Sequence, residues 1–174
     1  IEVIGRRIGL VKAMMTTVHA YTASQKLVDG PAKNWRRGRA AAVNFVPTST
    51  GAAVATTKVL PQYQGMFDGV AIRAPVPVGS ISDITMVTQR PTSVDEVNQI
   101  FEEEAASNRY RGVLGVTKEP IVSSDIIKDP RGAVVDLTMT NVVGGDLVKV
   151  MSWYDNEWGY ASQMVREGVH MVTH

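Results

Sequence analysis

The first candidate for chemistry is a histidine at the end of an apolar run. His19 follows Leu10 to Val18, whose β-branched and apolar residues predict a buried strand. The pKa of an imidazole lies near neutral pH, so His19 could act as a general base at the end of a sheet. A half-buried structural histidine fits the same pattern. The chain contains no cysteine that His19 could activate.

Arginines form the second candidate group. Arg36, Arg37 and Arg39 lie close together in a long segment without helical or strand periodicity, where they could bind phosphate or face solvent. Arg73 lies inside the apolar run Val70 to Ala74, where a charge usually needs an anionic partner. The sequence therefore predicts one or two sites for a phosphate or a carboxylate.

A hydroxyl-rich turn, Thr48-Ser49-Thr50-Gly51, comes before a short predicted helix. Hydroxyl groups and free backbone N–H groups at a helix start can hold an anion. The same residues can serve as an ordinary helix N-cap. The sequence leaves both interpretations open.

The aromatic segment from Trp153 to Tyr160 is the last candidate. It could form a flat wall in which the Asn156 side chain recognises the amide of a bound ring. It could equally be a junction between a strand and the C-terminal helix, with Asp155 or Asn156 as the cap. Local sequence does not decide between these interpretations.

No metal site is predicted. His170 and His174 lie four residues apart near the C-terminus, a spacing that can hold zinc, but no glutamate lies between them and we interpret them as a solvated tail. The absence of cysteine excludes disulfides, thiolate metal sites and a cysteine nucleophile within this chain. The sequence also contains no dinucleotide fingerprint and no P-loop.

The composition fits one globular domain. The chain has 174 residues, 44% of them hydrophobic and 20% charged, and a formal net charge of +1. This balance argues against binding to nucleic acid or to a membrane surface through bulk charge. The longest uncharged run, Ala40 to Thr57, contains too many polar residues to span a bilayer. We expect a cytoplasmic protein.

The elements that would position these residues alternate irregularly. Helices are expected over residues 1–7, 52–60, 92–105 and 157–172, and strands over residues 10–19, 70–74, 81–89, 112–116, 133–140 and 147–154. The strand at 81–89 alternates, with Ile81, Asp83, Thr85 and Val87 on one face. Because strands are not strictly separated by helices, we predict an α+β fold with a mixed, mostly antiparallel sheet and helices packed on one face.

Seven segments, taken in order, resemble the phosphorylating glyceraldehyde-3-phosphate dehydrogenases. The resemblance runs from about Gly9 to Met171 and covers only the catalytic half of such an enzyme. We therefore expect residues 1–174 to be the catalytic, substrate- and phosphate-binding domain, ending in a C-terminal helix. The Rossmann domain and the nucleophile motif Ser-Cys-Thr-Thr-Asn would lie before Ile1, outside this chain. The segments are MTTVHAYTASQK, VDGP, WRRGRAAA, VPTSTGAA, VAIRAPVPVGS, PIVSSDI and LVKVMSWYDNEWGY.

The resemblance assigns a role to each candidate. His19 would be the base that activates the catalytic thiol and later assists hydride transfer. Thr22 and Arg73 would hold the substrate phosphate. Thr50, Gly51 and Arg37 would hold inorganic phosphate. Asn156 would bind the nicotinamide carboxamide, with Tyr160 beside the ring.

The cofactor and the assembly are also implied by the resemblance. The loop from Tyr21 to Arg39 would line the cofactor site of a neighbouring subunit in a homotetramer. The pair Gly30-Pro31 resembles members that use NAD, although NADP is not excluded.

The implied reaction is the oxidation of glyceraldehyde 3-phosphate, with NAD and inorganic phosphate, to 1,3-bisphosphoglycerate. Two alternatives stay open. One is a paralogous erythrose-4-phosphate dehydrogenase. The other is an inactive stand-alone fragment that binds anions or supports oligomerisation. Because the chain has no cysteine, we predict no oxidoreductase activity for the isolated 174 residues.

Overall fold

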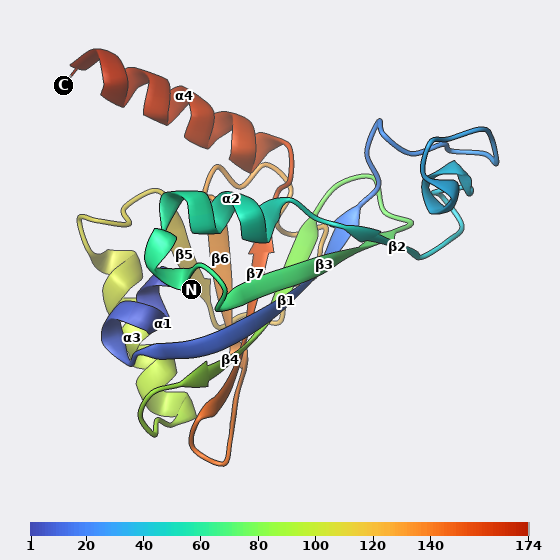
Figure 1. Cartoon of the computed structure of the whole chain (residues 1–174). Helices are drawn as coiled ribbons and strands as arrows, with labels where there is room; N and C mark the ends of the chain where they lie inside the picture. The colour runs from blue at the N-terminus through green and yellow to red at the C-terminus, as the bar shows by residue number, and fades with distance from the viewer. Residues whose placement is uncertain (174) are drawn as a thin grey trace.

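The computed structural model describes residues 1–173, and it has the predicted α+β architecture. A single seven-stranded sheet has the strand order β2-β3-β1-β4-β7-β6-β5 (Figure 1). The pairs β1–β3 and β5–β6 are parallel and the other four are antiparallel, so the sheet is mixed and mostly antiparallel. The strands are β1 (Leu10–Ala20), β2 (Val46–Ser49), β3 (Phe67–Ala74), β4 (Ser80–Thr88), β5 (Leu114–Thr117), β6 (Ala133–Val143) and β7 (Leu147–Tyr154).

Three helices pack on one face of this sheet: α1 (Glu2–Arg7), α2 (Ala52–Val59) and α3 (Val94–Ala106). The start of α3 is fixed by Ser93, whose hydroxyl accepts a hydrogen bond from the backbone N–H of Glu96. The α3 residues Val97, Ile100 and Phe101 recur at helical spacing and belong to the core cluster, so this side of the helix faces the sheet. The shared core includes Ile4, Met15, Met86, Val97, Ile100, Phe101 and Val150.

The opposite face of the sheet is more open. The register pairs Met14 with Thr85 and Thr85 with Lys149, so these three side chains point to the same side. Met14 and Val70 on this face are 56% and 50% exposed. The predicted alternation of residues 81–87 is confirmed.

Two details differ from the expected elements. Residues 46–49, which include Pro47, form the short strand β2, although Thr48 and Ser49 were expected in a turn that leads into a helix. A proline is tolerated there because β2 lies at the edge of the sheet. Strand β3 begins at Phe67 rather than Val70, and Gly69 allows it to lie close to β1, since a Cβ at that glycine would come 2.8 Å from the carbonyl oxygen of Met15.

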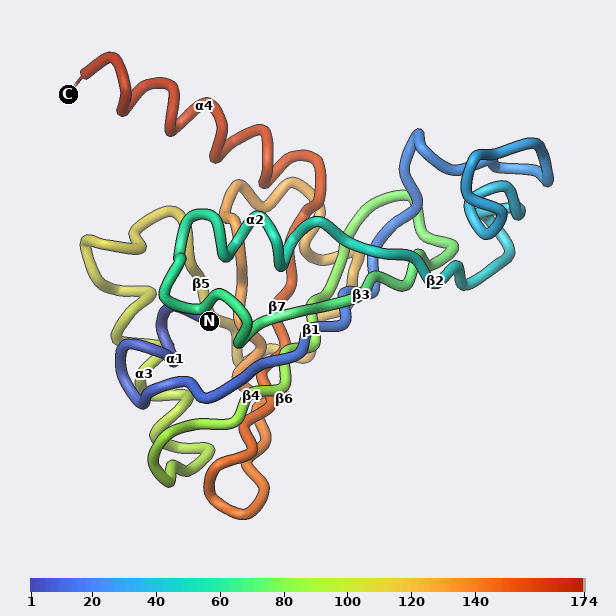
Figure 2. Tube along the Cα trace, viewed as in Figure 1, coloured from blue at the N-terminus to red at the C-terminus, as the bar shows by residue number. Residues whose placement is uncertain are grey.

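The long segment between β1 and β2 projects beyond the end of the sheet (Figure 2). Its only helical piece is the short 3₁₀ turn η1 (Trp35–Gly38), which agrees with the predicted loop. A second 3₁₀ turn, η2 (Pro61–Tyr63), follows α2. Within the loop, backbone bonds from Lys26 to Arg37 and from Gly30 to Gly38 hold its two arms together.

The C-terminal helix α4 (Trp158–Thr173) extends away from the sheet (Figure 1). Its contacts with the body include Gln163, which donates to the carbonyl oxygens of Gly112 and Pro130, and Arg166, which donates to that of Arg111. No helix within residues 1–173 has the length and apolar character needed to cross a membrane. His174 lies outside the described residues.

A cluster of charged side chains joins α1 to α3. The Glu104 side chain, only 6% exposed, pairs with Arg6 and accepts from Arg7 at 2.8 Å. Arg7 also reaches Glu103 at 2.5 Å. Burial alone would raise the pKa of Glu104, but the hydrogen bonds from Arg7 and Arg6 outweigh it and lower that pKa.

Candidate active site

The structure brings His19 and Arg73 side by side. Strands β1 and β3 run parallel, and their register places these two residues opposite each other. Nη1 of Arg73 lies 2.6 Å from Nδ1 of His19 and 3.1 Å from the carbonyl oxygen of Ala20. The same carbonyl lies 2.7 Å from Nδ1 of His19. The pairing of β1 with β3 thus brings together His19 and Arg73, which are 54 positions apart in the sequence.

An aromatic ring and a hydroxyl complete the surroundings of His19. The rings of His19 and Tyr154 meet edge to face, with centroids 5.9 Å apart and an angle of 70° between their planes. The Tyr154 hydroxyl is fixed in turn by a 2.7 Å hydrogen bond to Thr17, which is buried. These contacts orient the imidazole through its ring and through Nδ1.

The surroundings favour the neutral form of His19. Burial lowers the pKa of His19, the hydrogen bond to the Ala20 carbonyl opposes this, and the nearby charge of Arg73 lowers the pKa further. The net shift is downward from the ordinary value of 6.5. A neutral imidazole at neutral pH is the form that can accept a proton.

Arg73, which contacts His19, has a second guanidinium group nearby, that of Arg37. Arg37 donates from Nε to the hydroxyl of Thr48 at 3.1 Å, and Thr48 shares a face with Arg73 through the β2–β3 register. Burial first, and then the charge of Arg37, lowers the pKa of Arg73. Neither arginine forms an ion pair with a carboxylate within residues 1–173.

The buried Nε of Arg73 also lacks a hydrogen-bond partner among residues 1–173. A desolvated cation beside a second cation is costly unless an anion is present. The pair Arg73 and Arg37 therefore has the chemistry of an anion site. A groove of about 1230 Å³ adjoins it, lined by Arg36, Arg37, Thr48 and Ile72 among others.

Three of the predicted anion-binding residues stand apart from this pair. The hydroxyl of Thr22 lies 3.0 Å from that of Ser24, in the exposed loop after β1. Gly51 is the N-cap residue of α2, without a side-chain cap, and the Thr50 hydroxyl accepts from the backbone N–H of Ala52 at 3.1 Å. The described contacts do not join Thr22, Thr50 or Gly51 to Arg73.

Asn156 lies on the other side of His19 and is held firmly. Its Oδ1 accepts hydrogen bonds from the backbone N–H of Gly79 and from the hydroxyl of Ser80, both at 3.1 Å. Ser80 also accepts from the backbone N–H of Ala20, directly after His19. Tyr160, predicted to lie beside the cofactor ring, is 68% exposed in the first turn of α4.

Sequence reasoning missed Ser80. The predicted strand at 81–89 began one residue too late to include it, and a serine at a strand start carries no distinctive signal. The nearest clue was its place in the segment VAIRAPVPVGS, directly after Gly79.

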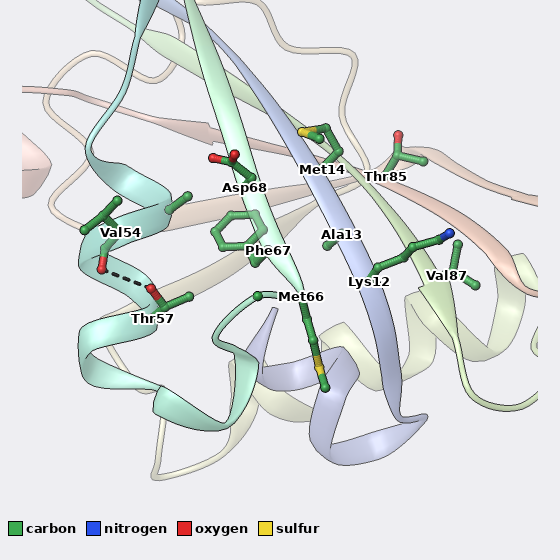
Figure 3. A pocket seen from close by; sticks show the side chains of 12 residues that line it. Lys12, Ala13, Met14, Val54, Thr57, Met66, Phe67, Asp68, Thr85 and Val87 are labelled. Atoms are coloured by element: carbon green, nitrogen blue, oxygen red, sulfur yellow. Dashed lines mark hydrogen bonds between the residues drawn. The ribbon is translucent and has the colours of Figure 1, made fainter.

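A separate apolar pocket of about 590 Å³ lies between α2 and strands β3 and β1 (Figure 3). It is lined by Lys12, Met14, Val54, Phe67 and other residues, and it contains none of the predicted site residues. The part of the chain that the structure describes holds no cluster of three or more metal-ligating His, Asp or Glu side chains. The candidate site is therefore the end of the sheet around His19.

Comparison with known proteins supports the sequence resemblance. A family described as glyceraldehyde 3-phosphate dehydrogenase, C-terminal domain, matches residues 1–156. Glyceraldehyde-3-phosphate dehydrogenase 2 of Streptomyces avermitilis is 49% identical over 94% of this chain and 49% of its own length. Glyceraldehyde-3-phosphate dehydrogenase of Mycobacterium tuberculosis is 51% identical over 94% of this chain and 48% of its own length. The chain spans about half the length of the curated relatives it matches.

Proposed function

This chain belongs to the glyceraldehyde-3-phosphate dehydrogenase family through its C-terminal domain, and from that premise we propose its function. It supplies the base and the phosphate ligands of an oxidoreductase that oxidises glyceraldehyde 3-phosphate with NAD and inorganic phosphate. The product is 1,3-bisphosphoglycerate. The thiol nucleophile comes from a part of the protein outside these 174 residues, which contain no cysteine.

The observation that carries the proposal is the contact of His19 with Arg73, whose guanidinium lies near that of Arg37. A neutral imidazole next to Arg73, with Arg37 near that arginine and no carboxylate paired to either within residues 1–173, suits a substrate that brings its own negative charge. A phosphorylated aldehyde and inorganic phosphate are both such anions. Arginine is well matched to them because its planar donors bind phosphate oxygens in pairs.

His19 is proposed to act through Nε2. Its Nδ1 faces the Ala20 carbonyl and Arg73, so Nε2 is the ring nitrogen left for a reacting group. With Nδ1–H donating to the Ala20 carbonyl, Nε2 would take the proton of the incoming thiol and the ring would hold it as an imidazolium. The thiolate is the reactive form of a cysteine, so this transfer activates the nucleophile.

Thr22 is proposed to add a hydroxyl donor to the substrate phosphate bound by Arg73. Thr50 and Gly51 are proposed to complete the site for inorganic phosphate with Arg37. The start of α2 supports the second assignment: the Thr50 hydroxyl already lies at the N–H of Ala52, and the N-cap residue Gly51 has no side chain to cap the N–H groups that follow. None of the described hydrogen bonds joins Thr22, Thr50 or Gly51 to Arg73.

The cofactor assignment rests on Asn156. Its Oδ1 is occupied by two protein donors, so its NH₂ group is the part that a ligand can meet, and the carbonyl oxygen of a nicotinamide carboxamide fits that donor. NAD supplies the hydride acceptor for the reaction when it is bound. Asn156 and Tyr160 would hold the nicotinamide end, and NADP stays possible as an alternative cofactor.

Assembly into a homotetramer and a cytoplasmic location stay predictions from the resemblance. The exposed apolar residues on the open face of the sheet, such as Met14 and Val70, are compatible with a covered surface in the whole protein. The size of a gel-filtration peak for the full-length protein would test the tetramer.

The substrate is tested with the full-length protein by following NAD reduction in the presence of phosphate. We expect kcat/KM for glyceraldehyde 3-phosphate to exceed that for erythrose 4-phosphate. The reverse order would favour the erythrose-4-phosphate dehydrogenase alternative. No turnover of either substrate would favour the anion-binding or oligomerisation module. The isolated 174-residue chain serves as the negative control, since it lacks a thiol.

A further inference from the structure

Ser80 connects the two halves of the candidate site. It is the first residue of β4 and only 2% exposed. It lies between the end of β1, which carries His19, and the segment that carries Asn156. Its hydroxyl accepts from the backbone N–H of Ala20 at 3.2 Å and lies 3.1 Å from Oδ1 of Asn156. Because a backbone N–H can only donate, the hydroxyl hydrogen of Ser80 remains available for Asn156.

This chain of hydrogen bonds fixes which end of the Asn156 amide faces the site. A carboxamide can be turned over without changing its shape, so its donors and acceptors must be assigned from their partners. Here both partners of the inner atom, the Gly79 N–H and the Ser80 hydroxyl, are donors, and that atom is therefore the oxygen. The outer atom is the NH₂ group, which has no hydrogen-bond partner within residues 1–173.

The position of the Gly79 N–H is itself constrained. Gly79 has a φ of 91°, which other residues rarely adopt, and a Cβ there would lie 2.5 Å from the carbonyl oxygen of Ser123. Gly79 thus supplies one fixed donor, and Ser80 supplies the second. An amide oxygen has two lone pairs, so together they use its full accepting capacity.

We propose that Ser80 is a positioning residue for cofactor recognition. Its hydroxyl holds the Asn156 amide with the NH₂ group outward, so that the site selects a ring bearing a carbonyl acceptor. The inference rests on the proposed function in one respect, namely that Asn156 meets the nicotinamide carboxamide. Ser80 acts through Asn156 and touches neither substrate nor cofactor.

The test compares two ligands on the full-length protein by titration calorimetry. The ligands are NAD and ADP-ribose, which is NAD without its nicotinamide ring. In Ser80→Ala we expect the Kd for NAD to rise about 5- to 30-fold, because a buried amide oxygen loses one of its donors. The Kd for ADP-ribose should stay within about two-fold of the wild-type value.

Ser152→Ala is the matched control. Ser152 is a buried serine on the neighbouring strand β7, 8% exposed, and its hydroxyl has no hydrogen-bond partner in the described part of the chain. Its loss should leave the Kd of both ligands unchanged. In an Asn156→Ala background, Ser80→Ala should add no further loss of NAD affinity, because the two residues act in series.

Three outcomes would overturn the proposal. An unchanged NAD affinity in Ser80→Ala would remove the role of Ser80, and equal weakening of NAD and ADP-ribose would make that role merely structural. An unchanged NAD affinity in Asn156→Ala would remove the proposed role of Asn156 as well, which separates the two failures. If Ser80→Ala does not fold, Ser80→Cys takes its place, since its thiol has a similar shape but donates weakly.

Discussion

His19 and Arg73 face each other across the parallel strands β1 and β3, with Nη1 of Arg73 2.6 Å from Nδ1 of His19. A guanidinium can only donate, so Nδ1 cannot accept from Arg73 and also donate to the Ala20 carbonyl. An anion that draws Arg73 away would let Nδ1–H donate to Ala20 and leave Nε2 as the basic nitrogen. In the proposed site, phosphate binding and the availability of the base would therefore be coupled through Arg73.

Arg73→Ala should mainly impair the use of anions. Loss of hydrogen bonds to a charged group predicts an increase in KM of about 10- to 100-fold for glyceraldehyde 3-phosphate or for inorganic phosphate. Steady-state kinetics of the full-length protein, with each anion varied in turn, measures this effect.

Arg90→Ala is the matched control for Arg73. Arg90 lies in the loop after β4 and pairs with Glu96 at 2.6 Å on an exposed surface, away from His19. Its removal should leave both KM values unchanged. If Arg73→Ala also leaves both values unchanged, Arg73 is not an anion ligand.

His19→Asn should lower kcat by about 10²- to 10⁴-fold, the usual contribution of a positioned base, with little change in the temperature of unfolding at neutral pH. Kinetics and thermal melts of the same full-length samples test both parts. Equal losses of activity and stability would indicate a structural histidine.

The pH dependence of stability provides a second readout for the same variant. Because burial lowers the pKa of His19 below 6.5, the unfolded state takes up a proton first as the pH falls below that value. The wild-type protein should therefore lose stability relative to His19→Asn only on the acidic side of about pH 6.5. Denaturant unfolding at several pH values would reveal this divergence, and parallel curves would contradict the lowered pKa.

Much of the fold could be predicted from local patterns. The apolar runs at β1, β4 and β7 and the 3.6-residue period of α3 are strong signals, and each element was found close to its true bounds. Strand β2 was missed because it has four residues and includes Pro47. Local propensity is weak in so short a segment, and its pairing with β3 depends on tertiary structure.

The site was only partly predictable. His19 and Arg73 stood out separately, one as a histidine ending a strand and the other as a charge in an apolar run. Their contact depends on a parallel pairing of β1 with β3, which no sequence pattern specifies. The role of Ser80 depends on the position of three other residues, so its own identity could not reveal it.

Glu104→Gln tests the link between α1 and α3. The buried carboxylate binds Arg6 and Arg7, so its neutralisation should lower the free energy of unfolding by about 1–3 kcal/mol. Because the folded-state pKa of Glu104 is lowered, its contribution is present above the ordinary value of 4.5 and is lost as the pH falls through the lowered pKa. Urea unfolding of the full-length protein at neutral and acidic pH measures both effects.

Glu102→Gln is the control for that measurement. Glu102 lies on the same helix, pairs with Lys118 at 2.5 Å and is 41% exposed. An exposed pair contributes little, so the variant should differ from wild type by less than about 1 kcal/mol. Equal effects of the two substitutions would show that burial does not strengthen the Glu104 contacts.

The most direct test of the account is the ionisation of the thiol that His19 is proposed to activate. The rate of its alkylation by iodoacetamide is measured against pH in the full-length protein and in His19→Asn. We predict that the wild-type thiol reacts at a pH well below the ordinary cysteine pKa of about 8.5, and that the variant's profile moves up toward that value. Superimposable profiles would contradict the proposed pairing of His19 with a catalytic thiol.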